Sequence, residues 1–134
     1  MLKLTYTENS FYLELLTQPI EEWIQAFCIL SLRVGQSLCV EPSTACFLLP
    51  ANLPGLGQLR SQIKQNTNGE IIDIYACDTE YVEVTLRGYW LSVSAQSING
   101  GFVTTMNHST ECFLHQLWLE ALEEGKRQKA FMQE

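Results

Sequence analysis

The sequence predicts an α+β domain in which an antiparallel sheet, made of an N-terminal hairpin and a C-terminal meander, is covered by about three helices. Strand-like and helical segments do not alternate strictly, as they would in a parallel α/β sheet. Residues 70–106 are rich in Ile, Val, Tyr, Thr and Trp, with turn residues between the apolar runs. All 134 residues carry such patterns with no linker, which predicts one domain over residues 1–134.

The N-terminal segments predict a β-hairpin. Residues 2–7 alternate apolar and polar side chains, and residues 11–16 resume as a second strand after the turn signal of residues 8–10. A helix follows, with Pro19 at its first position and Gly35 at its end. This helix is apolar around most of its circumference, which predicts a central position in the fold.

The middle of the chain predicts a strand, a loop and a short helix. Residues 38–49 form the strand, interrupted at residues 41–44, where Pro42 indicates an edge or a bulge. A loop over residues 50–54 leads into the helix, whose apolar residues are Leu56, Leu59 and Ile63.

The C-terminal half predicts an antiparallel meander and a long helix. The strands cover residues 70–77, 80–94 and 101–106, and Gly88 predicts a bulge or bend that splits the second of them. The helix opens at Ser109 or Thr110 and frays after Gly125. The helices are expected to cover one face of the sheet.

The charge balance argues against nucleic acid and anionic membranes as partners. The chain has 8 Lys+Arg against 15 Asp+Glu, a formal net charge of −7. Affinity for phosphate backbones comes mostly from clustered cations, which are lacking here. No apolar run reaches the length of a membrane span, and the N-terminus has no secretory signal pattern. A cytoplasmic location is therefore expected.

Cysteine and histidine use predicts no metal site. The five cysteines are an odd number among apolar neighbours, so we expect free and mostly buried thiols. His108, Cys112 and His115 recur at helical spacing and could bind zinc, but a convincing fourth ligand is lacking. We expect neither a metal nor another cofactor.

The meander predicts an interaction surface. If Val82 and its alternate neighbours face the core, Tyr81, Glu83 and Arg87 share the other face, and Trp90 is a candidate to join them. Exposed Tyr and Trp beside charges are typical of recognition surfaces. We therefore expect a non-enzymatic interaction protein that self-associates, as a homodimer, with an unknown protein partner as a further possibility.

The alternative is a small-molecule-binding protein or an enzyme. It would need a pocket that joins Asp73 and Glu83, at the acidic edge of the sheet, to His108 or His115. The sequence shows no complete set of nucleophile, base and orienting group, so no catalytic residue is assigned and this alternative ranks second.

Two segments resemble a known family. Residues 36–50, QSLCVEPSTACFLLP, and residues 81–91, YVEVTLRGYWL, are similar to those of a family of small uncharacterised cyanobacterial proteins of unknown function. The resemblance extends over most of the chain, including residues 2–7 and the C-terminal helix. It implies a cyanobacterial cytoplasm and transfers no catalytic role to any residue.

Overall fold

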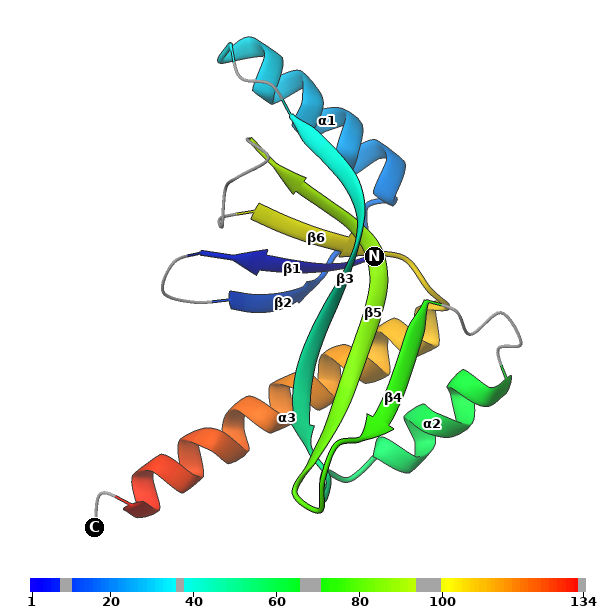
Figure 1. Cartoon of the computed structure of the whole chain (residues 1–134), viewed down its shortest axis with the longest axis vertical. Helices are drawn as coiled ribbons and strands as arrows, with labels where there is room; N and C mark the ends of the chain where they lie inside the picture. The colour runs from blue at the N-terminus through cyan, green and yellow to red at the C-terminus, as the bar shows by residue number, and fades with distance from the viewer. Residues whose placement is uncertain (8–10, 36–37, 66–70, 94–99, 133–134) are drawn as a thin grey trace.

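The computed structural model describes residues 1–7, 11–35, 38–65, 71–93 and 100–132. Figure 1 shows one sheet with helices packed around it. The elements, in chain order, are β1 (Leu2–Tyr6), β2 (Phe11–Leu15), α1 (Ile20–Arg33), β3 (Cys39–Pro50), α2 (Leu56–Gln65), β4 (Ile72–Ala76), β5 (Tyr81–Ser92), β6 (Gly100–Thr104) and α3 (His108–Met132).

The sheet confirms the predicted α+β class and both of its antiparallel parts. The strand order is β2-β1-β6-β5-β3, and β4 also pairs with β5. Every pairing is antiparallel. One edge of β5 pairs with β3 along its whole length, whereas β4 and β6 share the other edge. The sheet therefore branches at β5.

The branch lies at Gly88, and it explains why β5 is not split. The prediction of two shorter strands was wrong, because β5 runs unbroken from Tyr81 to Ser92. Gly88 lies between the β4-paired and β6-paired parts of the strand. A Cβ here would collide with the carbonyl oxygen of Val103 and lie 2.9 Å from the ring of Phe102. The glycine is needed for the close approach of β6.

Strand β3 is also continuous, so the predicted interruption at residues 41–44 was wrong. Pro42 pairs in register with Tyr89 inside the ladder. Proline lacks an N–H but is tolerated in an edge strand, and β3 ends the strand order. The edge position expected from Pro42 is therefore confirmed.

One face of the sheet is covered by α2 and α3. Phe102, Val84 and Leu86 point to this face and pack in one cluster with Leu59 of α2 and Leu114 of α3. Phe47 and Trp118 meet edge to face, with ring centroids 5.2 Å apart. Burial of these apolar side chains is the main driving force for the fold.

Helix α1 lies on the other face, which corrects two predictions. It packs against a second cluster made by Met1, Leu91 and Val103. The helices therefore cover both faces rather than one, because alternate residues of β5 and β6, with Met1 just before β1, give the second face an apolar patch as well. Nor is α1 central, since Ser31 is the only residue within the helix that is fully buried. Pro19 is the N-cap and not the first helical residue.

Helix α3 is longer than predicted at both ends. It begins at His108 because the side-chain oxygen of Asn107 accepts a hydrogen bond of 2.8 Å from the N–H of Ser109, which is an N-cap. It continues past Gly125 to Met132, where we expected fraying. Among the described residues, no helix has both the length and the apolar content that crossing a bilayer requires.

Candidate functional site

Within the described residues, no helix covers the part of the α1 side formed by β3, β4 and the first half of β5, and we call this part the open face. Strand β5 alternates, so Val82, Val84 and Leu86 are buried while the residues between them point to the α1 side. The pairing register extends the same face over β3 and β4. Its side chains are Thr44, Cys46, Leu48, Asp73, Tyr75, Tyr81, Glu83, Thr85 and Arg87.

Large apolar side chains gather at one end of the open face. Tyr75 and Leu48 flank Glu83 in register, and Tyr81 follows one step further along β5. All three apolar side chains are exposed, Tyr75 to 57%. Exposed aromatic groups of this kind are enriched among residues that anchor protein interfaces.

Charged and polar groups occupy the middle of the open face. Nη2 of Arg87 lies 2.8 Å from Oδ2 of Asp73, an exposed ion pair across two strands. The hydroxyl of Thr85 donates to Oε1 of Glu83 at 3.4 Å and lies 3.5 Å from Sγ of Cys46. The face therefore carries both signs of charge.

The structure places three of the four predicted interaction residues together and separates the fourth. Tyr81, Glu83 and Arg87 share the open face, as predicted. Trp90 lies on the opposite face, where its ring centroid is 5.6 Å from that of Tyr6 and it packs against the main core. Strand alternation alone predicts this result. Trp90 is nine residues from Tyr81, and residues separated by an odd number point to opposite faces of a strand.

The alternative ligand site is not assembled. Asp73 and Glu83 lie on the open face, whereas His108 and His115 belong to α3 on the other side of the sheet. The sheet itself separates the carboxylates from the imidazoles, so no pocket joins them among the described residues. Sequence spacing could not show this, because it does not reveal which face a helix covers.

Of the three residues considered as metal ligands, His108 and Cys112 are in contact. Nε2 of His108 lies 3.5 Å from Sγ of Cys112, one helical turn away. His115 and Cys112 both line a shallow pocket of about 470 Å³ together with Leu15. No three His, Cys, Asp or Glu side chains within the described ranges converge as metal ligands would.

The cysteines are free but less buried than predicted. Cys46 is exposed because the alternation of β3 turns its neighbours Ala45 and Phe47 inward. Cys77 is exposed in the connection between β4 and β5. The other three are half-buried, so the prediction of mostly buried thiols was wrong.

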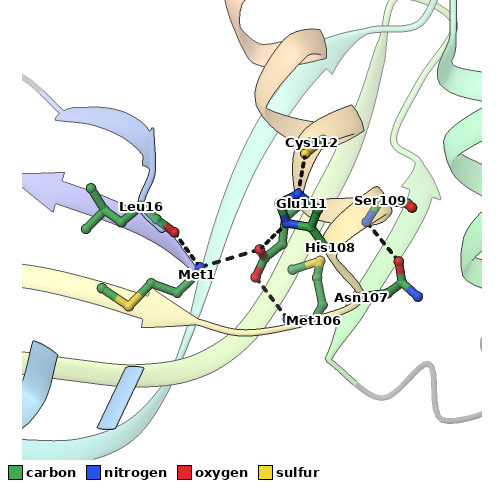
Figure 2. A network of polar contacts seen from close by, with 8 residues as sticks. All are labelled: Met1, Leu16, Met106, Asn107, His108, Ser109, Glu111 and Cys112. Atoms are coloured by element: carbon green, nitrogen blue, oxygen red, sulfur yellow. Dashed lines mark hydrogen bonds and ion pairs between the residues drawn. The ribbon is translucent and has the colours of Figure 1, made fainter. Parts of the chain in front are cut away.

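A buried polar network, which sequence reasoning missed, anchors the start of α3 (Figure 2). Oε1 of Glu111 accepts a hydrogen bond of 3.2 Å from the N–H of Met106, and Oε2 lies 3.4 Å from the N-terminal ammonium of Met1. That ammonium also donates to the carbonyl of Leu16 at 2.9 Å. The network joins β1, β2 and α3, which indicates a structural role.

A groove of about 870 Å³ opens at the end of the open face. Leu48 and Tyr81 belong to both features, so the two surfaces are continuous. The apolar part of the groove comes from β3 and α3, and two carboxylates, Glu80 and Glu124, stand in its lining. Its residues are Phe47, Leu48, Pro50, Asn52, Thr79, Glu80, Tyr81, Trp118, Ala121, Leu122 and Glu124.

The end of α1 is strongly exposed. Its last residues and C-cap, residues 29–34, form a feature that we call the α1 tip. Leu32 and Val34 are exposed to 75% and 69%, whereas Ser31 is buried. This arrangement inverts the usual preference for apolar residues inside and polar residues outside. Contiguous exposed apolar surface is more common at interaction sites than elsewhere on a protein surface.

A slot of about 320 Å³ lies between α1 and the sheet. The rings of Trp23 and Phe27 stack at 5.3 Å on one side, and Nζ of Lys3 stands 5.0 Å from the centroid of Trp23. Gly101 forms part of the opposite wall. A Cβ there would meet Lys3 and Trp23 at the ordinary distances of 3.7 and 3.9 Å, so packing does not forbid a side chain at this position.

The hydroxyl of Tyr6 is a titratable group whose pKa is perturbed by its surroundings. Burial raises the pKa of the Tyr6 hydroxyl above its usual value of 10.0, and the nearby thiol of Cys46 adds to the shift. Tyr6 lies at the end of β1, between the slot and a second pocket of about 420 Å³ beside β3. The hydroxyl therefore loses its proton at a higher pH than an ordinary tyrosine does.

The comparisons identify a family but no characterised relative. A family model described as Alr0857-like matches residues 1–122, which is most of the chain. This match agrees with the resemblance seen in the sequence. No curated protein matches the chain. No solved structure matches it either.

Proposed function

The chain belongs to the Alr0857-like family, and we propose that it is a non-enzymatic interaction protein that pairs with a second copy of itself through the open face. A cytoplasmic location is part of this proposal, supported by the five free cysteines, since reducing compartments keep thiols unpaired.

The observation that carries the proposal is the position of two opposite charges on β5. Glu83 and Arg87 lie on the open face, each two residues from Thr85. A two-fold axis that crosses the strands at Thr85 reverses the strand direction of the second copy. Glu83 of each copy then lies opposite Arg87 of the other. Self-complementarity of this kind is what a symmetric dimer requires.

The register shows which groups lie at this axis. Cys46 and Asp73 are the register partners of Thr85, so a thiol, a hydroxyl and a carboxylate that pairs with Arg87 of its own chain lie at the centre. Tyr75, Tyr81 and Leu48 lie to one side of it, where they enclose the charges at each end of the paired faces. Sheets that pack face to face lie about 10 Å apart, a distance that side chains of this size fill.

Charge reversal tests this arrangement. Glu83→Arg sets like charges opposite each other, so we expect the dimer to weaken at least about tenfold, a difference of roughly 1.4 kcal/mol. Arg87→Glu should do the same. The double variant restores the pair in reversed order and should recover most of the affinity, measured by sedimentation equilibrium. A wild-type chain that stays monomeric at high concentration would overturn the proposal.

Cross-linking at Cys46 tests the position of the axis. A bis-maleimide with a span of about 10 Å, the spacing of facing sheets, should join two Cys46 side chains. Cys46→Ser should remove the cross-link. Exposed Cys77 is the internal control, because it lies about four residues from the axis along β5, so its two copies are about 26 Å apart. A cross-link that persists in Cys46→Ser would contradict the axis.

A second candidate function is binding of a small planar anion in the slot between α1 and the sheet. The observation that favours it is Gly101, which leaves open a space that a side chain could occupy without collision. The stacked rings of Trp23 and Phe27 offer an aromatic wall, and Lys3 offers a cation.

The probe for this candidate is 2-naphthoate, an aromatic carboxylate. It should raise the midpoint of thermal unfolding of the wild-type chain, because a ligand that binds only the folded state stabilises it. Gly101→Ala should reduce the rise, since the added methyl group narrows the slot beside Lys3 and Trp23. An equal rise in both proteins, or none in either, would contradict binding in the slot.

A further inference from the structure

We propose that the α1 tip of each copy docks in the groove of the other copy, so that the dimer is held by two reciprocal contacts outside the open face. The inference rests on the proposed self-association and names the segment that fills the groove. Three independent observations support it: topology, shape and apolar character, and charge.

Topology brings the two features together. Helix α1 ends at Arg33 and leads into β3, which begins at Cys39, so the α1 tip lies near the start of β3 (Figure 1). The groove lies at the other end of the same strand, beside Pro50. An axis that crosses the strands at Cys46 brings the start of one β3 to the same side as the end of the other.

The distances along the strand place the start of one β3 about 10 Å beyond the end of the other. Cys39 lies seven residues from Cys46, about 23 Å, and Pro50 lies four residues away, about 13 Å. Because α1 lies on the same side of the sheet as the open face, the tip of one copy projects toward the partner and extends past the end of the partner's β3. The groove opens at that end, between Leu48 and Tyr81 of the open face and the α3 residues Trp118, Ala121 and Leu122 of the opposite face, so the tip reaches it around the end of the sheet.

The surfaces match in apolar character. The α1 tip exposes Ile29, Leu30, Leu32 and Val34 and buries only Ser31. The groove offers Phe47, Trp118, Ala121 and Leu122 as its apolar lining. Its volume of about 870 Å³ lies within the range of sites that bury several apolar groups.

The charges of the α1 tip and of the groove are complementary. Arg33 is exposed between Leu32 and Val34 and has no ion-pair partner in the part of the chain that the structure describes. Glu80 and Glu124 line the groove, and neither carboxylate has an ion pair within that same part. The cation of Arg33 beside these two carboxylates favours the contact, because opposite charges attract and each copy carries a formal net charge of −7.

Sedimentation equilibrium of variants in the α1 tip tests the contact. Leu32→Asp should weaken dimerisation at least about tenfold, because it places a charge in an apolar groove. Leu32 is 75% exposed, so the substitution should leave the thermal midpoint of the monomer unchanged. The matched control is Arg60→Glu on the exposed surface of α2, which should not alter the dissociation constant.

Charge exchange identifies the partner groups. Arg33→Glu should weaken the dimer, and the triple variant Arg33→Glu, Glu80→Lys, Glu124→Lys should recover the loss. If the wild-type chain dimerises and Cys46 cross-links, yet Leu32→Asp and Arg33→Glu leave the dissociation constant unchanged, this inference is overturned and the proposed self-association stands. A wild-type monomer would overturn both.

Discussion

Oε2 of Glu111 lies 3.4 Å from the N-terminal ammonium of Met1, and both groups are almost completely buried. A charge removed from water at this depth is tolerated because its partner and its hydrogen bonds replace the lost solvation. The pair connects the first strand to the start of α3, so these two distant segments depend on each other for their position (Figure 2).

Glu111→Ala should therefore be strongly destabilising. It leaves the ammonium of Met1 buried without its carboxylate and removes the acceptor for Met106, so we expect a loss of about 3–5 kcal/mol in the free energy of unfolding. Urea denaturation measures it. Glu123→Ala, at an exposed position of the same helix, is the control and should change stability by less than about 0.5 kcal/mol. Equal effects of the two substitutions would contradict the role of the pair.

Gly88→Ala should destabilise the sheet where β5 changes partner. The added methyl group meets the backbone of Val103 and the ring of Phe102, and backbone cannot move aside as a side chain can. Overpacking of this kind costs about 1–3 kcal/mol. Gly57→Ala in α2 is the matched control, because a Cβ there meets nothing within 4 Å. It should stabilise the helix by up to about 1 kcal/mol, and thermal unfolding of both variants checks the difference in sign.

Trp90→Ala and Tyr81→Ala should have different effects. Trp90 is partly buried and packs against the core, so its truncation should lower the free energy of unfolding by about 3 kcal/mol. Tyr81 lies on the open face, so its truncation should leave the monomer folded and weaken self-association by about 2 kcal/mol or more. Thermal unfolding and light scattering measure the two effects. A loss of fold stability in Tyr81→Ala as large as that in Trp90→Ala would contradict the assignment of faces.

The raised pKa of Tyr6 predicts a loss of stability in alkali. Above about pH 10 the tyrosine ionises in the unfolded chain while the native hydroxyl stays protonated. The unfolded state therefore binds fewer protons, and the free energy of unfolding falls as pH rises toward the native pKa. Tyr6→Phe should show a shallower fall than the wild type over this range. Absorbance at the phenolate band should also lose its most alkaline component; an unchanged titration curve would contradict the shift.

Thiol labelling should distinguish the exposed cysteines from the rest. Cys46 and Cys77 should react rapidly with a thiol reagent in the native protein, and the three half-buried thiols should react fully only after denaturation. The double variant Cys46→Ser, Cys77→Ser should lose the rapid phase. Rapid labelling of all five in the wild type would show that the native packing around the other three is loose.

The sequence by itself determined the local elements and the sharing of faces. Alternation along residues 2–7 and 11–16 identified the hairpin, and alternation along residues 81–87 placed Tyr81, Glu83 and Arg87 together. These patterns are reliable because the period of two follows from strand geometry alone. The family resemblance was likewise contained in the residues.

Only the tertiary structure decided what lies against each face. The apolar circumference of α1 was compatible with a central helix, yet the α1 tip lies exposed at the margin of the sheet. Sequence spacing allowed Asp73 to approach His108, but the sheet separates them. Periodicity reports which side chains share a face and not which element covers it, because that choice depends on contacts between segments far apart in the chain. Gly88 is a second example. A side chain cannot occupy that position because β6 packs close to it, and the sequence alone does not show this contact.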